Sequence, residues 1–191
     1  MNKLNNEQKI VRILFKDFLA FYNSRTISKV IGISHAGAFK LLKNMEKREI
    51  VKPKQIGKAI IYSLNTENPI TIREIEMALT IEAQTYKRWQ EEFKLLKENI
   101  KFLILFGSIL NNEKSAKDID ILIVADKNKF NAIKQIIRER NKISSRKIHL
   151  LLQGENDFIK DIKEKNKVIV EIIKQGVILF GQEEIVKILT K

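Results

Sequence analysis

Apolar residues in the first third of the chain recur at two different spacings. Residues 5–21 place one at about every third or fourth position, which predicts an amphipathic helix. A shorter helix fits residues 26–32, and Ser34 then provides an N-cap for a third helix of about 13 residues. Alternating apolar and polar positions around a glycine predict a hairpin over residues 48–65.

The third helix has two faces of different character. Its apolar residues form the stripe that we expect to face inward, namely Ala38, Leu41, Leu42 and Met45. The residues left on or near the outer face are small, polar or basic, namely His35, Gly37, Lys40, Lys43 and Asn44. These side chains are suited to contacts with base edges and phosphates.

Residues 27–65, ISKVIGISHAGAFKLLKNMEKREIVKPKQIGKAIIYSLN, resemble the winged helix-turn-helix of small prokaryotic repressors. The resemblance implies that the helix entered through Ser34 is the recognition helix and that residues 58–62 belong to the wing. That family usually has a glycine where Glu49 stands. Double-stranded DNA is the implied partner, and the implied contact residues are Ser34, His35, Gly37, Lys40, Lys43, Asn44, Lys54 and Lys58. The alternative is a module for protein docking or dimerisation.

Charge is concentrated in the same region. The chain carries a formal net charge of +13, and residues 1–68 hold 13 basic and 5 acidic residues, a net charge of +8. The longer remainder holds 23 basic and 18 acidic residues, a net charge of +5. This distribution indicates a polyanionic partner for the N-terminal third. A basic surface with no specific partner is the alternative.

Residues 69–98 have a helical pattern with no glycine or proline after Pro69. Thr71 and Glu74 have the spacing of a capping box, so we expect one long helix from there. Its apolar seam has two interpretations, a homodimer contact or packing onto the next domain. The seam residues are Ile75, Leu79, Tyr86, Trp89, Phe93 and Leu96.

From residue 100 the chain alternates strands and helices. The expected strands cover residues 100–106, 118–125 and 146–153, and the expected helices cover 127–142 and 156–175. Residues 177–181 and a short last helix close the chain. This order is typical of an α/β sheet with helices packed on it.

Two aspartates interrupt the second of these strands. Asp118 and Asp120 share one face because side chains alternate along a strand, and two unpaired carboxylates so close repel each other. A divalent cation between them would remove the repulsion. Gly107 and Ser108, at the end of the preceding strand, form a turn suited to phosphate oxygens. A nucleoside triphosphate held by the turn would meet Mg²⁺ or Mn²⁺ held by the aspartates.

This stretch resembles the polymerase-β-like nucleotidyltransferases, in particular the minimal nucleotidyltransferases of prokaryotes. Their pattern is an apolar strand, Gly-Ser, about ten residues, and Asp-x-Asp on the next strand, which Gly107, Ser108, Asp118 and Asp120 match one for one. The family usually carries a third carboxylate on a following strand. His149 stands at the aligned position, where it is a candidate general base or a structural residue.

The sequence therefore predicts a two-domain α+β or α/β chain. Residues 1–68 form a winged helix-turn-helix domain, residues 69–98 a linking helix, and residues 99–191 a nucleotidyltransferase-like sheet with helices. Three functions stay open: a DNA-binding regulator that binds nucleotide as a ligand, an active nucleotidyltransferase, and an antitoxin-like protein that acts on a helical partner protein.

Composition excludes several other classes of protein. The chain has no cysteine, which excludes disulfides and thiolate zinc sites, and only two histidines. Its apolar stretches are too short to span a membrane, and its first ten residues lack the apolar core of a signal peptide. We therefore expect a cytoplasmic protein with no membrane partner.

Overall fold

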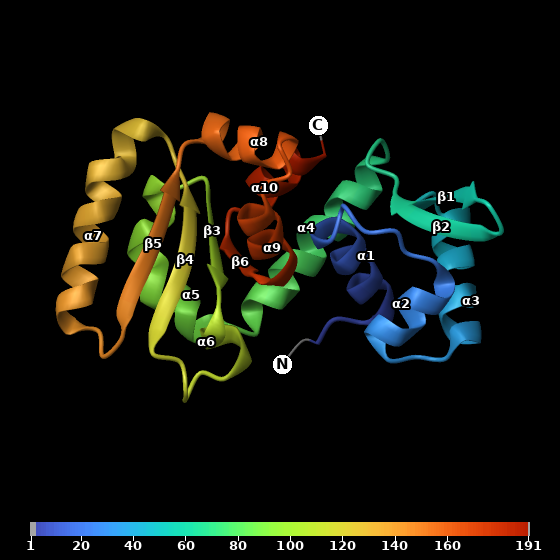
Figure 1. The fold of residues 1–191 in the computed structure, drawn as a ribbon, viewed down its shortest axis with the longest axis horizontal. Coiled ribbons are helices and arrows are strands. Elements are labelled where there is room, and N and C mark those ends of the chain that lie inside the picture. Colours follow the sequence, from blue (N-terminus) through green and yellow to red (C-terminus); the bar gives the residue numbers. More distant parts are fainter. Residues whose placement is uncertain (1–2, 191) are drawn as a thin grey trace. The chain divides into compact units, whose positions relative to one another are not determined.

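The computed structural model describes residues 3–190, and the chain divides into two compact units (Figure 1). The first unit ends at Ile81 and the second begins at Glu82, so the division falls inside helix α4 (Pro69–Gln84). The two units together give a mixed α and β chain, as the sequence predicts. No helix within residues 3–190 is long and apolar enough to cross a membrane.

The first unit is three helices followed by a two-stranded antiparallel hairpin. Its core is apolar and comes from every element, with Ile10 of the first helix, Ile27 of the second and Leu42 of the third fully buried. The elements before α4 are α1 (Asn6–Lys16), α2 (Ser24–Ile31), α3 (His35–Lys47), β1 (Val51–Ile56) and β2 (Ala59–Leu64).

The first helix is shorter than its apolar pattern predicts. It ends at Lys16 instead of residue 21, and Phe21 lies in the following turn with 74% of its surface exposed. Tyr22 forms an isolated bridge with Tyr62 of β2, and its hydroxyl donates to Asp17 at 2.7 Å. Burial and this hydrogen bond raise the pKa of Tyr22 to about 12. These contacts hold the chain in an extended course that a longer helix would not allow.

The turn after α3 uses a residue that is not glycine. Glu49 has φ 56°, in the left-handed region, and the next amide, Ile50 N, donates back to Met45 O at 2.9 Å. This is the bond from the second residue after a helix end that is typical of a Schellman motif. Asn65 and Asn68 both donate their side-chain amides to Glu49 O, at 2.9 and 3.1 Å. These two hydrogen bonds from a later segment hold the turn in place, which explains why Glu49 is tolerated in a strained backbone conformation.

Helix α4 starts and ends differently from the prediction. Pro69 is its first residue, and Asn68 Oδ1 accepts from Ile70 N at 2.9 Å, so the predicted capping box of Thr71 is wrong. Thr71 is instead fully buried. The helix stops at Gln84, where the Thr85 hydroxyl donates to Glu82 O at 2.7 Å and competes with the helical bonds.

The expected long helix over residues 71–98 is therefore divided. The apolar residues of its second half pack within the chain. A second helix, α5 (Lys87–Phe93), and a 3₁₀ segment, η1 (Lys94–Asn99), follow α4. Trp89, Phe93 and Leu96 are buried in the core of the second unit, with the rings of Trp89 and Phe93 stacked at 6.3 Å. These side chains are not available to a second copy, which removes the basis of the predicted homodimer.

The second unit is built on a four-stranded mixed sheet. The strand order is β5-β4-β3-β6, with β4 and β5 parallel and the other two pairs antiparallel. The elements after η1 are β3 (Phe102–Phe106), α6 (Ser108–Asn111), β4 (Asp118–Val124), η2 (Lys127–Lys129), α7 (Phe130–Ile143), β5 (Lys147–Gln153), α8 (Glu155–Lys163), α9 (Lys167–Gln175), β6 (Val177–Phe180) and α10 (Gln182–Leu189).

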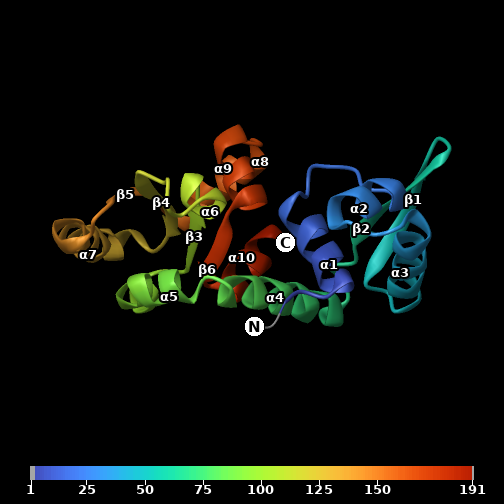
Figure 2. The ribbon, with the colours of Figure 1, turned by 90° about the horizontal axis from the view of Figure 1, so that it is seen from below.

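Helices cover both faces of this sheet (Figure 2). On one face α5 and α7 pack against Ile119, Ile121 and Ile123 of β4. On the other face α8 and α9 lie over β3, and the rings of Phe102 and Phe158 meet edge to face at 5.0 Å. The single helix expected over residues 156–175 is two helices, because Lys165 adopts φ 54° and turns the chain.

Replacing Glu49 with glycine should stabilise the first unit. A residue with a Cβ in the left-handed region destabilises the folded state by about 1–2 kcal/mol. Glycine removes this strain, but it loses more backbone entropy on folding, which offsets about 0.5–1 kcal/mol of the gain. We therefore expect Glu49→Gly to raise the free energy of unfolding by about 0.5–1 kcal/mol, measured by urea denaturation of the full chain. Glu49→Ala keeps the Cβ and should show no gain. Equal gains in both variants would assign the effect to the lost charge instead.

Candidate functional site

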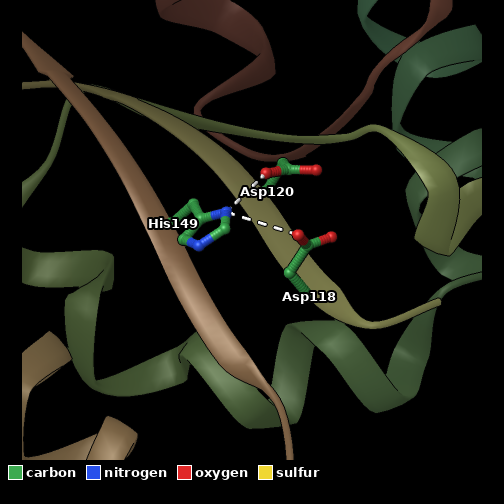
Figure 3. A group of neighbouring side chains, drawn as sticks. All are labelled: Asp118, Asp120 and His149. Carbon is green, nitrogen blue, oxygen red and sulfur yellow. Dashed lines mark ion pairs between the residues drawn. The ribbon is translucent and has the colours of Figure 1, made fainter.

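Asp118, Asp120 and His149 meet on one face of the sheet (Figure 3). The parallel register pairs Asp120 of β4 directly with His149 of β5. His149 Nδ1 lies 3.3 Å from Asp120 Oδ1 and 3.5 Å from Asp118 Oδ2. Within residues 3–190 this is the one group of three acidic or imidazole side chains whose ligand atoms all lie within 4.8 Å of one another.

Buried residues hold the two strands in this register. Ile119 and Ile121 alternate with the aspartates and are buried on the opposite face, so the carboxylates must face outward. Ile148, beside His149, is likewise buried. β5 is an edge strand, so one side of its backbone has no neighbouring strand. On that side the Asn141 side chain of α7 accepts a hydrogen bond from Ile148 N at 2.7 Å and donates one to Ile148 O at 3.3 Å. The pattern of the sequence did not reveal this role of Asn141.

The Gly107 turn contacts the same carboxylate. Phe106, the last residue of β3, pairs with Asp120, and Gly107 follows with φ 82° and ψ −160°. This region of backbone space is essentially restricted to glycine. A Cβ at Gly107 would clash with Asp120 Oδ2 and lie 3.2 Å from its Cγ. Ser108 begins the short helix α6 and is exposed. The structure thus places the Gly107 turn against Asp120.

The donor set of this site fits a divalent ion. The three side chains are partly exposed, at 36% for Asp118, 25% for Asp120 and 49% for His149, so solvent or phosphate oxygens can reach them. Two carboxylates provide two negative charges and oxygen ligands, and Nδ1 provides a nitrogen ligand. The Asp120 carboxylate occupies the space that a Cβ at Gly107 would fill, so the turn and the carboxylate lie in direct contact. The charges and the geometry therefore both favour a bound cation.

A cavity of about 410 Å³ adjoins the Gly107 turn. It lies between the end of β3 and helix α9, within the second unit, and its size is in the usual range for small ligands. Lys167 and Gln175 contribute polar groups, and Val168 and Ile172 contribute apolar surface. No pattern in the sequence indicates this cavity, since the lining residues of α9 are far from the Gly-Ser turn along the chain.

The predicted DNA-contact residues of the first unit lie on α3 and the hairpin, but several have partners within the unit. Ser34 caps α3 and accepts from Gly37 N at 3.1 Å. His35 Nε2 lies 2.8 Å from the Ser24 hydroxyl, so this ring faces α2. Asn44 donates to Glu7 of α1 at 3.3 Å. For His35 and Asn44, DNA contact would require these bonds to be shared or exchanged.

The lysines of the same surface remain exposed or half-buried. Lys43 donates to Glu46 at 2.9 Å, and this hydrogen bond raises the pKa of Lys43. A shallow cavity of about 720 Å³ runs along α3, and both Lys40 and Lys47 line it. Sequence reasoning missed Lys47, although its spacing from Lys40 and Lys43 places it on the same helical face. Lys54 and Lys58 are exposed on the hairpin.

Comparison with known proteins identifies the second unit. The sequence model of a family described as polymerase beta, nucleotidyltransferase matches residues 87–185. A search of curated proteins gives no match.

Two solved structures of ZitR from Lactococcus lactis, both of mutant proteins, are similar to parts of the chain. The mutant with one substitution is 14% identical, with a TM-score of 0.38, over 71% of this chain and 79% of that chain. The mutant with two substitutions is 16% identical, with a TM-score of 0.36, over 70% of this chain and 75% of that chain. Scores of this size do not establish a shared fold.

Replacing Gly107 with alanine should disrupt the site through Asp120. The new Cβ would combine a disfavoured backbone with a clash, so we expect a loss of about 2–4 kcal/mol in the free energy of unfolding, measured by urea denaturation. In an Asp120→Ala background the clashing carboxylate is absent, and the same change should cost only the backbone part, about 1–3 kcal/mol. Equal losses in both backgrounds would show that the turn does not press on Asp120.

Proposed function

The chain belongs to the polymerase β nucleotidyltransferase family, and we propose that its second unit binds a nucleoside triphosphate with Mg²⁺ or Mn²⁺. The observation that carries this proposal is the contact of the Gly107 turn with the carboxylate of Asp120, which shares its strand face with Asp118. A turn without side chains lets phosphate oxygens approach the backbone, and carboxylates beside it can share a cation with those oxygens.

Each site residue has a role in this proposal. Gly107 leaves room for the phosphates, and Ser108 offers its amide and hydroxyl to them. Asp118 and Asp120 hold the ion, which neutralises phosphate charge when bound. The cavity beside Gly107 accommodates a further part of the nucleotide or its acceptor.

We infer that nucleotidyl transfer by this site is slow. In transfer, an acceptor hydroxyl oxygen bonds to the α-phosphorus, the bond from that phosphorus to the pyrophosphate oxygen breaks, and the hydroxyl proton passes to a base. The second-unit site offers two carboxylates, both facing the same cation position, and His149 in place of a third. The imidazole ring nitrogen nearest the site already faces the two aspartates, so it is poorly placed to accept the proton.

For the first unit we propose binding to double-stranded DNA, as in a transcriptional regulator. The support is the outer face of α3, where Lys40, Lys43 and Lys47 follow one another along one side, and the exposed hairpin lysines beside it in the sequence. An antitoxin-like action on a helical partner protein stays a prediction.

Removing the two carboxylates should abolish metal-dependent nucleotide binding. We expect Asp118→Asn with Asp120→Asn to lose binding of labelled nucleoside triphosphates in the presence of Mg²⁺ or Mn²⁺, measured by equilibrium dialysis. The fold should stay intact or become more stable, because carboxylate repulsion is relieved.

The matched control for this variant is Asp126→Asn with Asp157→Asn. These two exposed aspartates carry the same charge and pair with Lys101 and Lys127, away from Asp118 and Asp120. The control should bind nucleotide normally. Undiminished binding by the Asp118 and Asp120 variant would place the nucleotide elsewhere and contradict the proposal.

DNA binding should separate the roles of Lys40 and Lys58. Lys40→Ala should change the preferred sequence selected from a random duplex library, since this helix face approaches the bases. Lys58→Ala should weaken all sequences alike and reduce the salt slope of log K by about 1, the loss of one phosphate contact. Lys163→Ala, at an exposed position at the end of α8 in the second unit, serves as the control and should have no effect. Absence of salt-dependent DNA binding at low ionic strength would favour the docking alternative.

A further inference from the structure

We propose that His149 is a direct metal ligand, so that the site holds one transition-metal ion such as Mn²⁺ in preference to Mg²⁺. The inference rests on the proposed function, because it uses the same two carboxylates. It adds a third metal ligand, the nitrogen of His149, and this nitrogen makes the site prefer a transition-metal ion to Mg²⁺.

The distances at the site match those between neighbouring ligands of a single ion. Ligands about 2.1 Å from one ion are about 3.0 Å apart at a right angle and about 3.4 Å apart at the tetrahedral angle. His149 Nδ1 lies 3.3 Å from Asp120 Oδ1 and 3.5 Å from Asp118 Oδ2. The two pairs that include His149 are therefore close to the spacing of ligands on one ion, and all three ligand atoms lie within 4.8 Å of one another.

The imidazole ring is placed for this role by the backbone. His149 stands opposite Asp120 in the parallel register, and Ile148 beside it is buried and bonded to Asn141 through both its amide and its carbonyl. Nδ1 is the ring nitrogen that faces the carboxylates (Figure 3). With 49% of its side chain exposed, the residue leaves the outward side of the site open to water and phosphate oxygens.

An imidazole ligand changes which ion is preferred. Mg²⁺ binds oxygen ligands in nearly ideal octahedral geometry and has little affinity for nitrogen. First-row transition ions accept imidazole readily, and Mn²⁺ also accepts the carboxylate and phosphate oxygens that this site would supply. A mixed set of one nitrogen and several oxygens therefore favours Mn²⁺ over Mg²⁺.

Charge balance favours one ion. Two carboxylates and a neutral imidazole carry two negative charges, which one divalent ion neutralises. A second divalent ion would leave an excess of positive charge on the protein side. We therefore expect a stoichiometry of one Mn²⁺ per chain at this site.

Pulsed electron paramagnetic resonance of the full chain with Mn²⁺ alone tests the inference. We expect hyperfine coupling from a directly bound ¹⁴N, and a change to the ¹⁵N pattern when the protein is made with ¹⁵N-histidine. The coupling should persist in His35→Gln, which alters the other histidine, and disappear in His149→Asn. The labelled native protein needs no substitution, so the test does not depend on how a variant folds.

Competition between Mn²⁺ and Mg²⁺ for the site gives an independent test of the inference. The ratio of Mn²⁺ to Mg²⁺ affinity should be at least about tenfold higher in the native protein than in His149→Asp, which has three carboxylates. Mn²⁺ binding without nitrogen coupling, and with a ratio unchanged in His149→Asp, would overturn the inference and leave the carboxylate site in place. Absence of Mn²⁺ binding both with and without nucleoside triphosphate would instead overturn the proposed function.

Discussion

The parallel pairing of β4 with β5 is the constraint on which the site depends. It sets Asp120 opposite His149, and a slip of one residue would turn one strand's entire set of side chains to the other face. Ile119 and Ile148 prevent such a slip, because each would have to leave the core. The side chain of Asn141 adds two hydrogen bonds to the backbone of Ile148 in the edge strand β5. Asp118, Asp120 and His149 are thus each held in position by a buried isoleucine next to them in the sequence.

The antiparallel neighbour supplies the second constraint. β3 ends beside Asp120, and the missing side chain at Gly107 allows the turn to lie in contact with the carboxylate. The Gly-Ser turn and the two aspartates are therefore brought together by adjacent strand pairings. No long loop is required to form the site, which explains why the motif is readable as a spacing along the sequence.

The sequence predicted the elements well where local pattern and tertiary packing agree. Three of the four strands of the sheet and the three helices before the hairpin are examples. It failed at Thr85, where a side-chain bond ends α4, and at Lys165, where a left-handed residue divides a helix. It also could not say which surface buries an apolar seam. Trp89 and Phe93 have the same spacing whether their partner is a second copy or the sheet of their own unit.

An imidazole instead of a carboxylate at position 149 changes the charge of the site without changing the strand pairings around it. The pairings of β4 with β3 and β5 are made by the backbone and do not depend on the side chain at position 149. The charge of the site does depend on it, because an aspartate there would add a third negative charge and a base for the acceptor proton. With His149 the unit keeps these strand pairings and carries one negative charge fewer than an aspartate at that position would give. Under the proposed function, the side chain at position 149 is therefore what would separate nucleotide binding from nucleotidyl transfer on this backbone.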